Sequence, residues 1–334
     1  MKNWIARLLK GEPRASAPGT PVASTAGASD AAAAAVTIAQ ADGAGLDQRF
    51  WDWLCEPLAG GDASQAAGPA ARLVLDELAR LARAPGQAAE LVPRVPEVIP
   101  RLLRSLRDEA VSSAELAREV TRDAVLVAEV IREANSPFHR PAKPVRTVDA
   151  AILVLGQNGL RMLLARVAFR PIMSASSGRC ARLVAPRLWL HSERCARAAS
   201  VLAPQLGADP FEGYLAGLML DVGLIVAFRL IDQLHESGSP PSDPAVIPAM
   251  LAGARELSAR IALHWELPPP IGAAILRAGQ PDAQPLARAL GQADRLAMMR
   301  LLFEHGLLDA DDPLLASLDS ASARILERLG AGPE

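Results

Sequence analysis

The amino-acid sequence predicts an all-α fold, and two features of its composition carry that prediction. Half of the 334 residues are hydrophobic but only 4% are aromatic, so Ala, Leu, Val and Ile must fill the core. Ala and Leu favour helices, whereas the β-branched and aromatic runs typical of strands are scarce. A chain of this length also provides enough apolar residues for one large domain or two modest ones.

The first 45 residues predict a short amphipathic helix on a flexible tether. In the segment 1–10, four apolar residues fall on one helical face: Trp4, Ile5, Leu8 and Leu9. Residues 11–45 are rich in Ala, Pro, Ser, Thr and Gly, and such a segment buries too little apolar surface to offset the entropy cost of ordering it. We therefore expect a disordered tether. The helix either docks on a partner or a membrane surface, or packs on its own domain or on nothing.

A helical lead-in is expected over residues 46–90. It opens with a compact apolar group that includes Phe50, Trp51 and Trp53, and this pattern favours a core anchor over a binding patch. Leucines then recur at helical spacing at positions 73, 75, 78 and 81. They predict a helix that ends at Pro85-Gly86.

Helical signals are dense from residue 91 onward and predict a domain over 91–330 with two helical subdomains, 91–169 and 179–330. In the first subdomain, Ser112 and Glu115 have the spacing of a capping box. The run Asn135-Ser136-Pro137 would stop a helix that begins near Asp123. The other helices expected there are one over 96–107, one capped by Thr147 or Asp149 that ends at Gly156, and one over 160–169.

In the second subdomain, the sequence around residue 209 indicates a helix start. Asp209 suits the N-cap, Pro210 suits the first helical position, and the carboxylate of Glu212 complements the helix dipole. The other helices expected in this subdomain cover 188–202, 245–265, 270–278, 286–305 and 313–329.

Several of these segments together resemble the HDOD domain, a family similar in fold to the HD-domain metal phosphohydrolases. The resembling segments are VPRVPEV at 92–98, SAELA at 113–117, ANSPF at 134–138, VDAAILVLG at 148–156 and GYLAGLMLDVG at 213–223. They are similar to the family patterns LPxLPxV, sxxeLa, aNSaxy, sieeAixxLG and aflaGLLHDIG, and the resemblance extends over about residues 91–302. It implies an HD-like helical bundle that serves bacterial signal transduction, in a family whose members mostly act without catalysis.

The resemblance also implies where a metal site would lie. An HD site combines a His from one helix, an adjacent His-Asp pair from a second helix and a later Asp. Here the first His matches His191, the last Asp matches Asp294, and the pair falls on Leu220-Asp221, so an aliphatic side chain without a lone pair replaces its His. The further histidines of two-metal relatives would fall near Arg255 and near Ala278-Gly279, where the chain has none. A protein without a metal cofactor and without catalysis is therefore expected.

The remaining polar residues at these positions predict a buried cluster in place of a metal centre. Asp221 lies in an apolar helix, so it must be paired or neutral once it is buried. The cluster is expected at His191, Leu220, Asp221 and Asp294, with Arg194 and Arg295 as possible partners. It would be retained because the loss of one partner strands the others. A structural ion bound weakly by two carboxylates and one imidazole stays open as an alternative.

The sequence favours a cytoplasmic, non-catalytic signalling or scaffold protein whose partners are regulatory proteins. The formal net charge of −2 provides no basic surface for nucleic acid, no uninterrupted apolar run is long enough to span a bilayer, and the three cysteines lie far apart, as in a reducing compartment. Peripheral membrane contact through residues 1–10 is compatible with this interpretation.

Two alternatives stay open, a metal-dependent phosphohydrolase acting on nucleotides and a helix-turn-helix DNA-binding protein. For the latter, Asp123, Glu129 and Glu133 would place acidic groups on the recognition helix.

Overall fold

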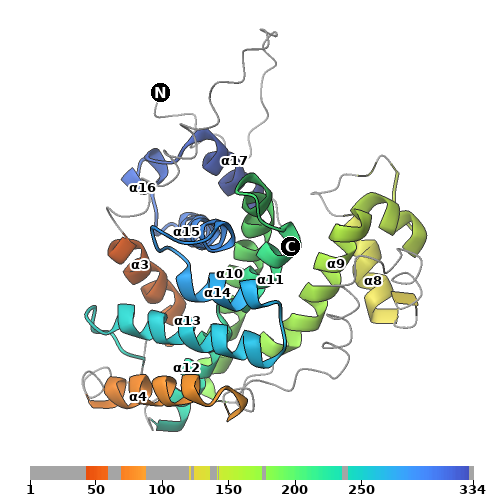
Figure 1. Ribbon diagram of the computed structural model, residues 1–334. Coiled ribbons are helices and arrows are strands. Elements are labelled where there is room, and N and C mark those ends of the chain that lie inside the picture. Colours follow the sequence, from red (N-terminus) through yellow and green to blue (C-terminus); the bar gives the residue numbers. More distant parts are fainter. Residues whose placement is uncertain are drawn as a thin grey trace.

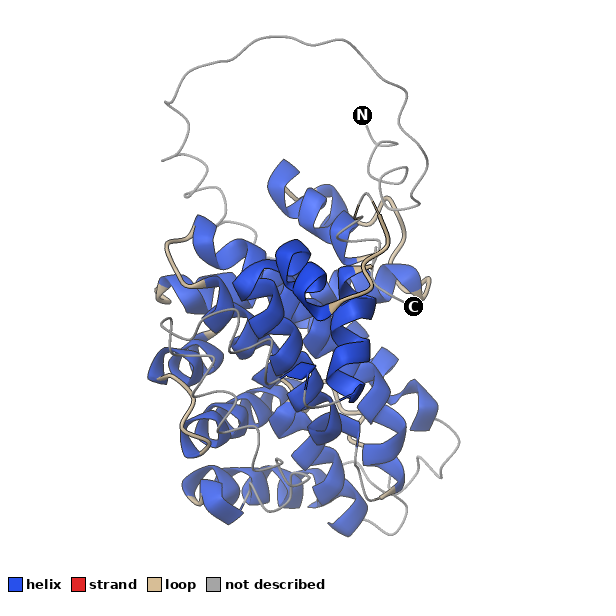
Figure 2. Ribbon diagram, turned by 90° about the vertical axis from the view of Figure 1, so that its right-hand side faces the viewer, coloured by secondary structure: helices blue, strands red, loops and turns tan. Residues whose placement is uncertain are grey.

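The computed structural model describes residues 43–58, 69–87, 120–121, 124–135, 141, 143–174, 178–234 and 240–330. Within these ranges every regular element is a helix, which confirms the predicted all-α fold (Figures 1 and 2). Several expected features lie outside the described residues, and these are the amphipathic helix 1–10, residues 11–42 of the tether, the helix 96–107 and the capping box of Ser112 and Glu115.

The N-terminal part of the described chain contains α3 (Gly43–Cys55), the short 3-10 helix η1 (Glu56–Leu58) and α4 (Pro69–Arg83). Because α3 begins at Gly43, helical structure starts slightly before the end expected for the tether. Its aromatic side chains Phe50, Trp51 and Trp53 are each 1% exposed, and the indole N–H of Trp51 donates to the carbonyl of Pro241 at 2.8 Å. These aromatic residues therefore anchor the core, as the sequence predicts.

The range predicted for the first subdomain contains, among the described residues, α8 (Ala124–Ala134) and the start of α9 (Val148–Ser174), and Figure 1 shows both helices on one side of the molecule. Asn135 follows α8 and fixes the chain beyond it, because its side chain bonds both the N–H and the carbonyl of Val145 at 2.8 Å. Thr147 caps α9 by accepting from the N–H of Ala150 at 3.2 Å, so the first of the two expected caps is used. Gly156 has a φ of 68° and kinks α9 at the predicted helix end.

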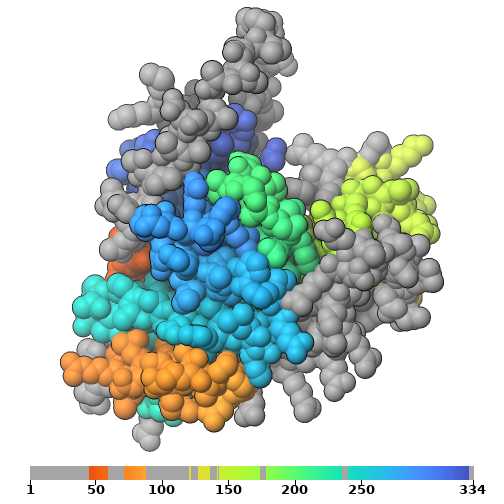
Figure 3. Space-filling view, viewed as in Figure 1, coloured from red at the N-terminus to blue at the C-terminus, as the bar shows by residue number. Residues whose placement is uncertain are grey.

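The range predicted for the second subdomain contains α10 (Arg179–Gln205), α11 (Pro210–Met219), α12 (Val222–Leu234), α13 (Ile247–His264), α14 (Pro269–Arg277), α15 (Pro285–Glu304), α16 (Pro313–Ala316) and α17 (Ser320–Leu329). Helix α10 packs most extensively against α11 and α15. The lead-in joins this subdomain where α4 lies along α13, as Figure 3 shows on one face. Asp209 accepts from the N–H of Glu212 at 2.8 Å and starts α11 as predicted.

The single helix predicted over 313–329 is wrong, because two helices occupy this range. Asp312 accepts from the N–H of Leu314 at 2.9 Å and starts α16. Asp319 accepts from the N–H of Ser322 at 2.7 Å and starts α17. A side chain that caps a new helix competes with continuation of the preceding one, so Asp319 separates the two.

Small residues allow α11 and α12 to lie directly on their neighbours. A Cβ atom on Gly217 would lie 2.4 Å from the backbone N and Cα of Ala196 in α10. A Cβ atom on Gly223 would lie 1.9 Å from the carbonyl oxygen of Ala254 in α13. Only glycine fits at these two positions. The junction between α11 and α12 is therefore held deep inside the core.

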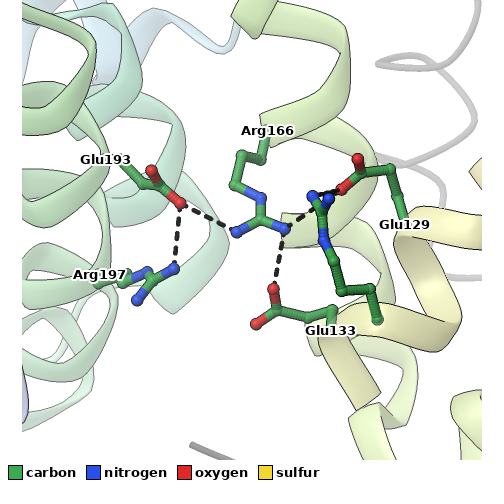
Figure 4. Close-up of polar contacts among 6 residues, drawn as sticks. Glu129, Glu133, Arg166, Glu193 and Arg197 are labelled. Atoms are coloured by element: carbon green, nitrogen blue, oxygen red, sulfur yellow. Dashed lines mark hydrogen bonds and ion pairs between the residues drawn. The ribbon is translucent and has the colours of Figure 1, made fainter. Parts of the chain in front are cut away.

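Arg166 of α9 links the two subdomains, as Figure 4 shows. Its guanidinium lies 2.8 Å from the carboxylate of Glu133 in α8 and 2.9 Å from that of Glu193 in α10. Arg197 contacts the same oxygen of Glu193 at 3.0 Å. Because the Arg166 side chain is only 10% exposed, solvent and salt screen these ion pairs little. They fix α8 relative to the second subdomain.

Within the described part of the chain, two helical stretches are long and apolar enough to span a membrane by length and composition, namely Val148–Met173 and Pro210–Leu234. The first is half buried within the fold, and the second is wholly buried. Core residues of a large helical bundle are apolar for the same reason as residues that face lipid, namely exclusion from water. Burial in the protein core is thus sufficient to explain the apolar character of the second stretch.

Candidate functional site

Three helical segments of the second subdomain bring together the polar residues that the sequence singles out. His191 lies near the middle of α10, Asp221 lies at the junction of α11 and α12, and Asp294 lies in α15. His191 is fully buried, and Asp221 and Asp294 are each 3% exposed. Ionisable groups at such depth are unfavourable unless each has a partner of opposite charge or a hydrogen bond. The packing of these helices supplies those partners.

Ser258 of α13 stabilises the chain at the junction that carries Asp221. Its hydroxyl donates to the carbonyl of Leu220 and accepts from the N–H of Gly223, both at 2.8 Å. These two backbone groups would otherwise be buried without partners at the break between helices. The side-chain direction of Asp221 is therefore set by a rigid backbone and not by a mobile loop.

The contacts within the cluster are short. Nδ1 of His191 lies 2.7 Å from Oδ2 of Asp221, and the hydroxyl of Ser192 donates to the same oxygen at 2.7 Å. On the other side of the ring, Nε2 of His191 lies 3.2 Å from Oδ1 of Asp294, at ion-pair distance but without hydrogen-bond alignment. The second oxygen of Asp294 accepts from Arg255 of α13 at 2.6 Å. The imidazole thus lies between two carboxylates.

This arrangement favours a protonated imidazole. Burial alone would lower the pKa of His191, but Asp221 and then Asp294 outweigh burial and raise it to about 10. Burial would raise the pKa of Asp294, but Arg255 and His191 outweigh it and hold that pKa below its ordinary value. At neutral pH the cluster therefore contains an imidazolium and a guanidinium that compensate the buried carboxylates.

Helix α3 covers the cluster. The ring centroid of Phe50 lies 4.6 Å from that of His191, so an aromatic side chain packs directly on the imidazole. Asp47 lies one turn earlier on the same helix, and burial, followed by the charge of Asp294, raises its pKa. Sequence reasoning placed Phe50 in the core but did not connect it with His191. No local signal relates two residues that meet only after the helices pack.

The donor atoms do not fit a divalent cation. Both ring nitrogens of His191 already face carboxylates, and one oxygen of Asp294 is held by the positive charge of Arg255. Leu220 is 2% exposed and offers no lone pair at the place of the missing imidazole. Within the part of the chain that the structure describes, no group of three or more His, Cys, Asp or Glu side chains has an arrangement that could hold a metal ion.

The structure assigns the neighbouring arginines differently from the sequence analysis. The expectation that Arg194 partners the buried carboxylates is wrong, because its guanidinium pairs with Glu304 at 2.6 Å. The charge of Arg295 acts on Asp294 and helps to lower its pKa, but no direct ion pair joins the two side chains among the contacts described. Arg255 is the direct partner of Asp294. In the sequence, Arg255 stands out only because a histidine of two-metal relatives would fall near it.

Comparisons with known proteins give a consistent family assignment. The model of the HDOD domain matches residues 92–281. An uncharacterised protein of Treponema pallidum strain Nichols is 24% identical over an alignment of 193 residues, and the match covers 54% of this chain and 36% of that protein. The chain therefore spans about a third of the length of this curated relative.

Two solved structures share the fold. An HDOD domain protein of unknown function from Geobacter sulfurreducens has a TM-score of 0.54 and 24% identity, and the match covers 76% of this chain and 98% of that one. A protein from Shewanella amazonensis SB2B, whose name assigns it provisionally to the metal-dependent phosphohydrolases, has a TM-score of 0.52 and 16% identity, with 78% and 99% covered. At these identities the likeness shows the fold alone. Because the matching family model covers more than half of the sequence, the chain belongs to the HDOD family.

Proposed function

We propose that this protein is a non-catalytic signalling or scaffold module of the bacterial cytoplasm that acts through contacts with regulatory proteins. The observation that carries the proposal is the placement of His191, whose two ring nitrogens face Asp221 and Asp294 at 2.7 and 3.2 Å. A hydrolase of the HD type needs lone pairs directed at a metal that activates water. A protonated imidazole between two carboxylates has no lone pair to offer.

Two further features support a structural role for this cluster. Arg255 supplies a fixed positive charge where a metal-binding protein would present another neutral donor. Phe50 covers the imidazole from α3 and reduces access of water to it. A cluster of this kind joins α10, α13 and α15 through charges, so the helical core becomes a rigid platform for partner contacts.

DNA binding through α8 has less support. Glu133 of α8 pairs with Arg166, and Glu129 of the same helix pairs with Arg132. A helix that enters the major groove presents basic side chains to the phosphates. The acidic side chains of α8 and their use in packing against α9 favour a structural role for this helix.

Metal analysis combined with a hydrolysis assay tests the proposal. The purified protein is analysed by inductively coupled plasma spectrometry after incubation with manganese or iron, and phosphodiesterase turnover is measured in parallel. We expect metal well below one equivalent and no turnover above that of the His191→Gln variant. Stoichiometric metal together with turnover that His191→Gln abolishes would overturn the proposal in favour of a phosphohydrolase.

A pull-down comparison tests the protein-contact part of the proposal. The full chain and a chain that lacks residues 1–10 are used as baits under identical conditions. If the segment with Trp4, Ile5, Leu8 and Leu9 docks on a partner, the shorter bait loses regulatory proteins that the full chain recovers. Recovery of the same partners by both baits would show that this segment has no docking role.

A further inference from the structure

A cavity of about 260 Å³ opens beside the buried cluster. One wall is a face of α15, where Arg288, Gln292 and Arg295 follow one another at intervals of four and three residues. Asp47 of α3 and Arg255 of α13 line it from other sides. Sites for small organic molecules start at about 300 Å³, so this cavity suits a small ligand.

A close backbone contact shapes a second wall of the cavity. Gly279 has a φ of 79°, and its backbone N would lie only 2.3 Å from a Cβ atom on Gly291. The turn after α14, which includes Gln280 and Pro281, is therefore held directly against α15 and lines the cavity. The cavity is thus formed by packed helices and a tight turn.

The charges that face the cavity do not cancel. Three arginines and two aspartates line it, so fully ionised groups leave an excess of one positive charge. Arg255 and Asp294 compensate each other in their ion pair at 2.6 Å. Burial, followed by the charge of Asp294, raises the pKa of Asp47, and the charges of Arg255 and Arg295 act against this shift. The excess positive charge therefore lies at Arg288 and Arg295, neither of which forms a direct ion pair among the contacts described.

The two remaining arginines have donor capacity to spare. Nε of Arg295 is buried and has no hydrogen-bond partner among the described residues, a state that is unfavourable for a charged group. Arg288 makes no ion pair with any described side chain, although it is partly buried at the cavity wall. Guanidinium groups bind phosphate through paired N–H donors and tolerate partial burial better than ammonium groups do.

We propose that this cavity binds a small molecule that carries a phosphate group, through Arg288 and Arg295, with Arg255 held in place beside them by Asp294. This inference rests on the proposed function, in that the ligand is bound and not hydrolysed. A phosphate group has three terminal oxygens that can accept from both guanidinium groups at once, whereas a carboxylate has two oxygens and matches a single guanidinium fork. The bound ligand would contact α3, α13 and α15 together. Occupancy of the cavity would then couple the concentration of the ligand to the surface of the module.

Calorimetric titration of the full-length protein with inorganic pyrophosphate tests this site. Acetate at the same ionic strength is the control ligand, Arg288→Gln is the test variant, and Arg260→Gln, on the exposed face of α13, is the matched control. Release of orthophosphate from the pyrophosphate is measured on the same samples. Circular dichroism checks the fold of each variant, and Arg295→Gln takes the place of Arg288→Gln if the latter does not fold.

We expect saturable binding of pyrophosphate that Arg288→Gln weakens by about tenfold or more and that Arg260→Gln leaves unchanged, because a hydrogen bond between two charged groups is lost. The absence of saturable binding, equal weakening by Arg260→Gln, or equal affinity for acetate would overturn the site. Orthophosphate release would instead overturn the non-catalytic function, while a loss of binding in Arg288→Gln would still support the site.

Discussion

At the residue scale, His191 shares its positive charge between the two buried carboxylates of Asp221 and Asp294. The removal of one member of a buried ionic cluster costs more than the contact itself, because the remaining charges stay desolvated without compensation. The same side chain therefore determines both the stability of the core and the protonation state of the cluster.

We predict that His191→Gln lowers the free energy of unfolding by about 3–5 kcal/mol, since glutamine cannot carry the charge that compensates two buried carboxylates. Urea unfolding followed by circular dichroism measures the change. His264→Gln is the matched control, because His264 is exposed at the end of α13, and we expect it to stay within about 0.5 kcal/mol of the parent. A loss below about 1 kcal/mol for His191→Gln would contradict the ionic description of the cluster.

The pKa of His191 also predicts how stability depends on pH. Folding raises this pKa from 6.5 to about 10, so the folded state holds a proton that the unfolded state releases earlier. The resulting stabilisation is fully present below about pH 6.5 and is lost as the pH rises through about 10. Burial raises the pKa of Cys180 and acts in the same direction. The contribution of His191 is therefore the difference in the free energy of unfolding between the parent and His191→Gln, measured by urea unfolding from pH 6 to 10. If the free energies of the two proteins change with pH in parallel, the prediction is contradicted.

At the element scale, the position of the cluster depends on how closely α11 lies on α10. The backbone of Ala196 occupies the space in which a side chain on Gly217 would have to fit, and neither helix can retreat without opening the core. Gly253 of α13 is different, because a Cβ atom there would meet Leu78 at an ordinary contact distance of 3.7 Å. Two glycines in helices of one subdomain should thus respond in opposite ways to the same substitution.

We predict that Gly217→Ala destabilises the protein by about 3 kcal/mol or more through overpacking. Gly253→Ala is expected to be neutral or to stabilise by up to about 1 kcal/mol, because alanine is a better helix former and has room at that position. Thermal and urea unfolding of the two variants measure the contrast. Equal effects of the two substitutions would show that the contact between α10 and α11 is less close than described.

The helix starts can be predicted from the sequence where a capping residue and its partner lie close together along the chain. Asp209 and Thr147 cap their helices within three residues along the chain, so their pattern is visible before folding. The division between α16 and α17 was missed because the apolar spacing on both sides of Asp319 is compatible with one continuous helix. The pairing of Arg194 with Glu304, and of Asp294 with Arg255, depends on how distant helices pack, and no spacing rule contains that information.

At the scale of the whole molecule, the lead-in and the second subdomain form one packed unit. The order of motifs along the chain was sufficient to predict the family and the all-α fold, but it assigned α3 no relation to the cluster. In the structure Phe50 packs on His191, and Arg49 pairs with Asp312 near the C-terminal end at 2.8 Å. Contacts from α3 thus reach α10, α13 and α15 as well.

We therefore predict that α3 unfolds together with the core and not as a separate segment. In native-state hydrogen exchange at increasing urea, the amides of α3 and α10 should open with the same free energy and the same urea dependence. Phe50→Ala should lower the opening free energies of both α3 and α10 by about 3–5 kcal/mol, because it removes a fully packed aromatic ring. Leu73→Ala on α4 is the control, because this side chain is 55% exposed. Its loss should change the opening free energy of neither helix by more than about 0.5 kcal/mol. If Phe50→Ala lowers protection in α3 but leaves α10 unchanged, the lead-in is an independent unit that can leave the cluster exposed while the core stays folded.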